Sequence, residues 1–240
     1  MTALRLLDLN FGTPAQNLAC DEALLEELEA GFGEPTLRFW QSPVPFVVLG
    51  YSNSIATEVN RAECERRGIP ILRRSSGGGT VVQGLGCLNY NLTLPITDET
   101  ASITETNCFV MRRNRDALTE LLKRDVQIQG HTDLAIDGLK FSGNAQRRKS
   151  RALVFHGSIL LHFDLDLIGA VLAHPSKEPE YRLRRSHREF LMNLNVPADP
   201  VKAALTKAWS ATDVVKGPSH IRIEALVKER YENRAWNEKF

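Results

Sequence analysis

The chain has 240 residues, of which 42% are apolar and 25% are charged, and 30 basic against 29 acidic residues give a net charge of +1. This apolar content excludes a disordered chain, and the balanced charge argues against a basic nucleic-acid coat. The sequence has no run of roughly 20 apolar residues, so it predicts no membrane-spanning helix, and its N-terminus lacks the pattern of a secretory signal. We therefore expect a cytoplasmic protein that binds neither nucleic acid nor membrane.

The cysteines and histidines lack the spacing of a metal site. Cys20, Cys64, Cys87 and Cys108 are far apart in the sequence, and the histidines form no H-x-x-x-H or H-E-x-x-H pattern. We expect reduced cysteines, most of them buried as small apolar residues. A G-x-S-x-G nucleophile elbow is also missing, which weakens a hydrolase interpretation.

The N-terminal part predicts a strand and then a helix. Residues 4–9 are β-prone, Thr13 is a suitable N-cap, Pro14 suits the first helical position, and Gly31 ends the helix. Further strands are predicted at 36–40, 46–51, 69–74, 81–94 (two runs), 133–136 with Phe141 around the turn Asp137-Gly138, and 153–163. Further helices are predicted at 58–67, 107–123, 165–172, 200–211 and 224–232, and residues 174–187 as a long surface loop.

This order of elements predicts the fold class. Strands in clusters, with helices between and after them, are typical of an α+β protein with a mixed, largely antiparallel sheet and helices packed on it. No repeat period and no linker interrupt the chain. We therefore expect a single domain over residues 1–240.

Three windows carry candidate chemistry. In the first, Arg73 and Arg74 precede the contiguous glycines 77–79, whose backbone N–H groups can form an anion-binding nest. The window lacks the lysine of a P-loop and the glycine spacing of a dinucleotide fingerprint. A flexible hinge with two solvated arginines is the alternative.

The second and third windows are less specific by themselves. Lys140 follows the turn Asp137-Gly138 and could bridge two anionic oxygens, or be an ordinary surface lysine. Arg147, Arg148, Lys149 and Arg151 form a basic run that is usually a solvated loop but could close over a phosphate. His156 stands inside an apolar run, where a hydrogen-bonded core histidine is more common than a catalyst.

Taken together, the windows resemble the lipoate–protein ligase family within the biotin/lipoate ligase fold group. The matching segments are R-R-x-S-G-G-G-x-V at 73–81, G-x-K-x-S-G-N-A at 138–145 and H-G-S-I-L-L at 156–161. Weaker similarities lie at 17–22, 37–40 and 58–60 and at the close of the chain, so the resemblance covers nearly all of it in order.

The resemblance implies a mixed sheet with helices on one side and a tunnel for a fatty-acid-like chain. It also implies a reaction in which lipoate and MgATP give lipoyl-AMP and pyrophosphate, after which the lipoyl group passes to a lysine of a lipoyl carrier domain. Lys140 would be the catalytic residue, bridging the acyl carbonyl and phosphate oxygens. The implied ATP- or adenylate-binding residues are Arg73, Arg74, Gly77, Gly78, Gly79, Thr80, Val81, Val82 and Lys140. The implied lipoate-binding residues are Lys140, Gly78, Gly79, Ser142, Gly143, His156 and Gly157.

Two features depart from that family's pattern. Gln83 stands where family members usually carry His. The chain also ends where many ligases continue into a small C-terminal accessory domain, and relatives without that domain can need a separate accessory subunit for activation. We therefore expect a catalytic domain without the accessory domain. Such a domain is expected to perform the transfer step by itself more readily than the adenylation step.

Other functions remain open. Octanoyltransferases of similar sequence take octanoate from acyl carrier protein through a cysteine thioester, and their cysteine precedes the counterpart of Lys140. Residues 127–139 contain no cysteine, and Cys87 and Cys108 have no obvious activating base. Biotin ligase is disfavoured because the biotin loop is missing. A non-enzymatic protein that binds an acyl adenylate or acts as a scaffold is a further alternative. The presence of Lys140 argues against it, because binding alone does not need that residue.

Overall fold

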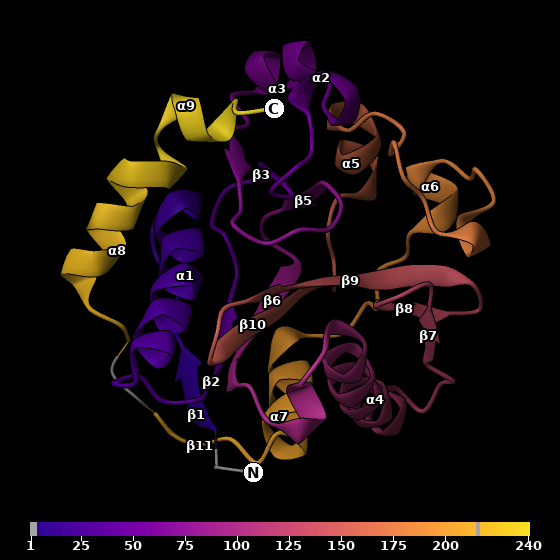
Figure 1. Ribbon diagram of the computed structural model, residues 1–240. Helices are drawn as coiled ribbons and strands as arrows, with labels where there is room; N and C mark the ends of the chain where they lie inside the picture. Colours follow the sequence, from indigo (N-terminus) through magenta and orange to yellow (C-terminus); the bar gives the residue numbers. More distant parts are fainter. Residues whose placement is uncertain (1–3, 215–216) are drawn as a thin grey trace.

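The computed structural model describes residues 4–214 and 217–240 (Figure 1). Its main sheet has eight strands in the order β11-β1-β2-β6-β10-β9-β8-β7, and a second sheet has three in the order β4-β3-β5. The main sheet consists of β1 (Arg5–Asp8), β2 (Thr36–Trp40), β6 (Cys87–Pro95), β7 (Gln127–Gln129), β8 (Asp133–Ile136), β9 (Leu139–Arg148), β10 (Ala152–Leu160) and β11 (Thr212–Val214). The second sheet consists of β3 (Phe46–Leu49), β4 (Ile71–Arg73) and β5 (Val81–Gln83).

Helices connect and cover these strands. They are α1 (Pro14–Ala30), α2 (Ile55–Glu58), α3 (Arg61–Arg67), α4 (Ile103–Leu122), α5 (Leu165–Val171), α6 (His187–Phe190), α7 (Ala198–Ala208), α8 (His220–Leu226) and α9 (Arg234–Asn237). The 3-10 turns η1 (Asp98–Thr100) and η2 (Glu180–Arg182) and the π-helical turn η3 (Val227–Tyr231) complete the elements. Within the described ranges, no helix combines the length and apolarity needed to cross a bilayer.

The sheet topology confirms the predicted α+β class with a mixed, largely antiparallel sheet. In the main sheet β1 runs parallel to β2 and β11, and every pairing from β2 through β7 is antiparallel. In the second sheet β3 is parallel to β4 and antiparallel to β5. The predicted hairpin between β8 and β9 is present, with positive φ at Asp137 (53°) and Gly138 (74°), as a two-residue hairpin turn requires.

The main sheet is covered on both faces, so the implied arrangement with helices on one side is wrong. Helices α4 and α7 pack together against one face, and their apolar residues join those of β2, β6 and β10 in the largest buried cluster. On the other face α1 contacts β6 and β10 and carries α8 on its outer side (Figure 1). The second sheet lies beside α1 on this face, which leaves room for a cavity between the two sheets.

Helix boundaries follow the predicted caps where a cap residue is present. The Thr13 hydroxyl accepts a hydrogen bond from Gln16 N, and Gly31 ends α1 with φ 87°. The predicted helix 58–67 is instead two helices, because Asn60 caps α3 by accepting a bond from Glu63 N. Helix α4 begins earlier than predicted, after its N-cap Ser102, and the C-terminal helix begins at His220.

Gly86 is a position where the fold requires glycine. Its φ is 84°, and its carbonyl accepts hydrogen bonds from the N–H groups of Leu161 and His162. A β-carbon at this position would stand 2.6 Å from His162 O and 2.7 Å from His162 C, both rigid backbone atoms. Gly68, the C-cap of α3, also has a positive φ of 65°, but a β-carbon there meets nothing within 4 Å.

We predict that Gly86→Ala lowers the free energy of unfolding by about 2–4 kcal/mol, because left-handed strain and a backbone clash add. The matched control Gly68→Ala introduces the strain alone and should cost about 1 kcal/mol. Urea denaturation followed by circular dichroism measures both. Equal costs for the two variants would contradict the clash.

Candidate active site

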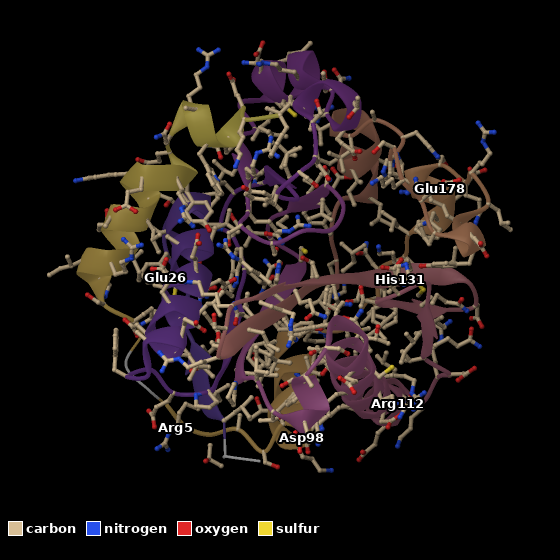
Figure 2. All side chains as sticks on the ribbon, in the orientation of Figure 1. Arg5, Glu26, Asp98, Arg112, His131 and Glu178 are labelled. Atoms are coloured by element: carbon tan, nitrogen blue, oxygen red, sulfur yellow. The ribbon has the colours of Figure 1, made fainter. Side chains whose placement is uncertain are left out.

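A cavity of about 530 Å³ lies between the two sheets. Its floor is formed by β6 and β10, which contribute Asn89, Asn91, His156 and Ser158. Its other walls come from the glycine turn (residues 75–80), from β5, from the β8–β9 hairpin and from residues 174–192, which we call the strap. Figure 2 labels Glu178 on the strap and His131 at the hairpin side below it. This size is typical of a small-molecule site.

The glycine turn is built around the buried side chain of Arg74. Its Nη2 donates to Gly77 O (2.6 Å) and Gly79 O (2.7 Å), and its Nε donates to the Ser76 hydroxyl (3.0 Å). Gly78 has φ 87°, and a β-carbon there would stand 2.9 Å from Arg74 Nη2. Because a trans peptide directs N–H opposite to C=O, the N–H groups that follow these two carbonyls point away from the guanidinium.

Arg74 keeps its charge in this setting. Burial lowers the pKa of Arg74 to about 10, which still leaves the guanidinium protonated at neutral pH. Its hydrogen-bond partners among the described residues are carbonyls and a hydroxyl, with no carboxylate. Arg74 therefore fixes the turn and adds an unneutralised positive charge behind it.

The structure places the side chain of Arg73 away from the cavity to which its implied role would assign it. Its guanidinium is fully buried and donates to Asn53 O (2.6 Å), Tyr51 O (3.0 Å) and Asn237 O (3.0 Å). Trp236 Nε1 in turn donates to Arg73 O (2.8 Å). Since successive residues of a strand point to opposite sides, Arg73 faces α9, while Arg74 faces the cavity.

His156 joins the floor of the cavity to the glycine turn. Its Nε2 lies 2.6 Å from the Ser76 hydroxyl, and it pairs in register with Asn91 on β6 and Ala145 on β9. Burial, reinforced by the nearby Arg74 charge, lowers the pKa of His156 to about 3. The imidazole is therefore neutral, and it supports the turn through a hydrogen bond.

Lys140 extends from β9 into the cavity and is paired with an acid that we did not predict. Its Nζ lies 2.8 Å from Asp133 Oδ1, and the Tyr181 hydroxyl donates to Asp133 Oδ2 (2.8 Å). A β-carbon on Gly143 would stand 2.8 Å from Lys140 Nζ, so glycine leaves the space that the ammonium occupies. Asp133 lies on β8, across the hairpin from Lys140 on β9. An acidic residue in the strand that pairs with the strand of Lys140 is the feature of the sequence that could have predicted this ion pair.

Asn144 connects the hairpin to the core beneath the sheet. Its Oδ1 accepts from the Tyr90 hydroxyl (2.6 Å), which accepts from Asn114 Nδ2 (2.9 Å), whose Oδ1 accepts from Trp209 Nε1 (2.8 Å). The Asn144 side chain occupies the place where a β-carbon of Gly157 would stand. The H-G-S motif therefore needs glycine at position 157, because the Asn144 side chain leaves no room for a β-carbon there.

Arg147 and Arg148, the first two residues of the basic run, lie at the end of β9 and bind other parts of the chain. Arg147 Nη1 donates to Glu22 Oε1 (3.2 Å) and Ser75 O (3.2 Å), and Arg148 Nη2 donates to Thr100 O (2.7 Å). Arg147 thus braces α1 and the glycine turn, and Arg148 braces η1, so for these two side chains the solvated-loop interpretation is wrong. Glu22 also accepts from Tyr231 Oη (2.7 Å).

The structure brings most of the predicted site residues to one cavity. Those that line it are Arg74, Gly78, Gly79, Thr80, Val81, Val82, Lys140, Ser142, Gly143, His156 and Gly157. Arg73 does not line it, and Gly77 contributes to the turn through its carbonyl. Residues 174–187 of the strap, predicted as a surface loop, form a wall of the cavity through residues such as Pro179 and Arg182. Its composition is polar because one side faces solvent and the other carries charged groups inward.

The cysteines stand outside the cavity lining of the described chain. All four are free; Cys20, Cys64 and Cys87 are buried and Cys108 is exposed on α4. Burial raises the pKa of Cys87 to about 12, so its thiol is neutral and a poor nucleophile.

The described residues contain no group of three or more His, Cys, Asp or Glu that could hold a metal ion. Proteins usually bind Mg²⁺ through one or two carboxylates together with substrate phosphates. Asp133 is a carboxylate at the cavity that could serve in this way.

Comparison with known proteins identifies the family. Residues 13–210 match the sequence model of the lipoyl protein ligase A/B catalytic domain. The chain belongs to this family.

Relatives in the family include both ligases and transferases. The chain is 28% identical to lipoate-protein ligase A subunit 1 of Thermoplasma acidophilum, over 94% of this chain and 92% of that protein. It is also 28% identical to the octanoyltransferase LipM of Brevibacillus brevis, over 94% of this chain and 95% of that protein. The family is enzymatic, and these identities do not separate the two activities.

Solved structures give the same fold. The chain aligns with TM-score 0.83 and 27% identity to a bipartite lipoate protein ligase from T. acidophilum, described with its E2 lipoyl domain, over 99% of this chain and 97% of that one. It aligns equally well, with TM-score 0.83, 27% identity and 99% coverage of both chains, to a lipoate-protein ligase A bound with ATP. The lipoate/biotin ligase catalytic-domain fold predicted from the motifs is thus confirmed.

We predict that His156 makes the protein less stable in acid. Its pKa is about 3 in the fold against an ordinary 6.5, so the unfolded chain binds more protons in this interval and the free energy of unfolding falls as pH drops from 6.5 towards 3. The slope contributed is at most about 1.4 kcal/mol per pH unit. His156→Gln should show a shallower loss in urea denaturation between pH 7 and pH 5.

His220→Gln, at an exposed position on α8 outside the cavity, is the matched control and should keep the wild-type slope. His187, whose pKa burial lowers to about 4, contributes equally in all three proteins. Identical slopes in wild type and His156→Gln would show that the imidazole does not resist protonation.

Proposed function

We propose that this protein is a lipoate–protein ligase that activates lipoate with ATP and transfers the lipoyl group to a lysine of a lipoyl carrier domain. The observation that carries the proposal is the placement of Lys140 and the Arg74-braced glycine turn in one cavity that no cysteine of the described chain lines. An adenylate route needs donors for phosphate and carbonyl oxygens, whereas a thioester route needs a thiolate.

In the first step, a carboxylate oxygen of lipoate attacks the α-phosphorus of ATP. An oxygen–phosphorus bond forms, the bond to the β-phosphate breaks, and pyrophosphate leaves with the electron pair. The attacking group and the phosphate are both anionic, so their approach is unfavourable without a cation between them. Lys140 supplies that ammonium, and the N–H groups of the glycine turn, backed by the charge of Arg74, bind the phosphate oxygens.

In the second step, the neutral amine of the carrier lysine attacks the lipoyl carbonyl carbon. A carbon–nitrogen bond forms, the bond from that carbon to the phosphate oxygen breaks, and AMP leaves with the electron pair, while the attacking nitrogen releases one of its two protons to solvent and keeps the other as the amide N–H. Negative charge grows on the carbonyl oxygen during the attack. Lys140 stabilises that charge because its ammonium reaches both the carbonyl and the phosphate oxygens.

Asp133 determines how Lys140 is presented to these groups. In the free protein its carboxylate lies 2.8 Å from the ammonium and so holds the lysine side chain in the cavity. A phosphate and a carbonyl together offer Lys140 more acceptors than one carboxylate oxygen does. Asp133 keeps the Tyr181 hydrogen bond when the ammonium turns towards the substrate.

The cavity also has apolar surface for the acyl chain. Its apolar lining includes Leu18, Trp40 and Val48 from one buried cluster, Leu160, Ile168 and Leu172 from another, and Val154. Burying each methylene of the acyl chain contributes about 0.8 kcal/mol to binding.

A separate accessory subunit is part of the proposal for the activation step. Its support is the relative named as subunit 1 and the structure described as a bipartite ligase. Octanoyl transfer is the second candidate function, and its support is the similarity to LipM octanoyltransferases.

The test supplies an apo lipoyl domain with lipoyl-AMP, with lipoate, ATP and Mg²⁺, or with octanoyl acyl carrier protein, and follows the carrier by mass spectrometry. We expect lipoylation from lipoyl-AMP, which needs the transfer step alone, and no octanoylation from the acyl carrier protein. Lipoylation from lipoate and ATP, with pyrophosphate released, would show that this chain also performs activation and would overturn the need for an accessory subunit. The double variant Cys87→Ala/Cys108→Ser should retain activity. Octanoylation alone, lost in the cysteine variant, would replace the ligase by the transferase.

Lys140→Ala should reduce lipoyl transfer at least 1,000-fold while the thermal unfolding midpoint stays within a few degrees. The loss removes stabilisation of charge in the transition state, a contribution of the order found for single oxyanion donors or larger. Lys207→Ala removes an exposed ammonium that pairs with Glu120 on α4, and it should keep full activity. Near-normal transfer by Lys140→Ala would reject the mechanism.

A further inference from the structure

The strap is fastened to the hairpin that carries Lys140. Met192 N donates to Lys140 O (2.9 Å), and Arg185 Nη2 donates to Gly138 O (3.0 Å). The Tyr181 hydroxyl donates to Asp133, the carboxylate partner of Lys140. The strap therefore has a defined position relative to the lysine.

Arg182 is the strap residue whose guanidinium is turned inward. The residue is 5% exposed and lines the cavity, and its guanidinium carbon stands 4.8 Å from the centre of the Phe190 ring. Its Nε donates to Arg185 O (3.0 Å) and lies 3.5 Å from Glu178 Oε2. Its Nη2 is buried and has no hydrogen-bond partner among the described residues.

This unpartnered group is costly where it stands. A buried N–H of a charged side chain without an acceptor gives up its hydration and gains nothing in return. Burial accordingly lowers the pKa of Arg182, with Glu178 offsetting part of the effect. An acceptor brought into the cavity by a ligand would recover the missing hydrogen bond.

The backbone is strained in a way that keeps Arg182 inside. The next two residues, Leu183 and Arg184, have φ of 53° and 59°. Residues other than glycine rarely adopt this left-handed backbone conformation. Leu183 is 76% exposed, so the turn sends one side chain into solvent directly after burying the other. Such strain persists where the surrounding structure fixes it, and it concentrates at functional sites.

Unlike Arg74 and Lys140, Arg182 has a buried donor, Nη2, with no acceptor among the described residues. Arg74 donates to the carbonyls of the glycine turn, and Lys140 faces Asp133. The planar fork of a guanidinium matches the oxygens of a phosphate in a bidentate manner.

We propose that Arg182 binds a phosphate of the acyl donor, at a distance from the phosphate that Lys140 and the glycine turn hold. Which molecule carries this phosphate depends on the proposed function. In an ATP-dependent ligase the group is a phosphate of the nucleotide, and in a transferase it is the phosphate of the carrier's phosphopantetheine arm. The shared chemistry is a phosphate with oxygens free to accept from Nη2.

Calorimetric titration of the full chain with ATP tests the nucleotide. Arg182→Gln should raise the Kd of ATP about 10- to 100-fold, as expected for a hydrogen bond to a charged group, and leave the Kd of lipoate within twofold. The Kd of ATP for Arg182→Lys should lie between the values for wild type and Arg182→Gln, because an ammonium restores the charge but not the two parallel donors of a guanidinium. Arg184→Gln, the same change on an exposed side chain two residues away, should bind ATP as wild type does.

The second arm compares octanoyl-phosphopantetheine with octanoyl-pantetheine as donors. If wild type uses these and ignores ATP, the ligase proposal fails, and Arg182→Gln should then remove the preference for the phosphorylated donor. Wild-type behaviour of Arg182→Gln in both arms overturns the assignment whichever function holds. Should Arg182→Gln fail to fold, Arg182→Lys decides: weakened phosphate binding at an unchanged thermal midpoint supports the assignment, and unchanged binding overturns it.

Discussion

The candidate site depends on a single buried guanidinium. Arg74 is almost fully buried and donates to carbonyls of the glycine turn rather than to a carboxylate. Burying a charge without a counter-ion is unfavourable, and the converging carbonyls and the Ser76 hydroxyl offset that cost only in one arrangement of the turn. The turn is therefore set before any ligand arrives, with a positive charge behind it. Dipoles and charges fixed in this way lose no free energy to reorganisation when negative charge develops.

Arg74 and Lys140, two cations of the site, are held by opposite means. Arg74 is locked by backbone acceptors, whereas Lys140 is held by Asp133, a side chain that a ligand can replace. Tyr181 shares that carboxylate, so the strap is connected to the same ion pair. A ligand that takes Lys140 from Asp133 changes the charge balance beside the strap. Asp133 is thus shared by the ion pair of Lys140 and by the strap.

Much of the fold and part of the site could be predicted from the sequence, because they rest on local chemistry. Thr13, Pro14 and Gly31 bound α1 as caps do, and Asp137-Gly138 makes the hairpin that presents Lys140. Asp133 could be found only by pairing it with Lys140 across the hairpin. Tyr181 and Arg182 could not be found in this way, because the strap meets the hairpin through contacts between residues 47 and 48 positions apart in the sequence. The polar composition of the strap indicated a surface loop because composition cannot tell which side of a segment faces a cavity.

Arg73 and Arg74 are adjacent residues of one motif, but their side chains bind different parts of the chain. Strand geometry sends them to opposite sides, so Arg74 shapes the turn while Arg73 binds the carbonyls that close α9. A second link runs from Tyr231 through Glu22 to Arg147 and the Ser75 carbonyl. The family match ends at residue 210, yet both links reach beyond it. The glycine turn is thus held from the cavity side by Arg74 and from behind by the C-terminal segment. Its geometry is consequently a property of the whole chain rather than of the motif alone.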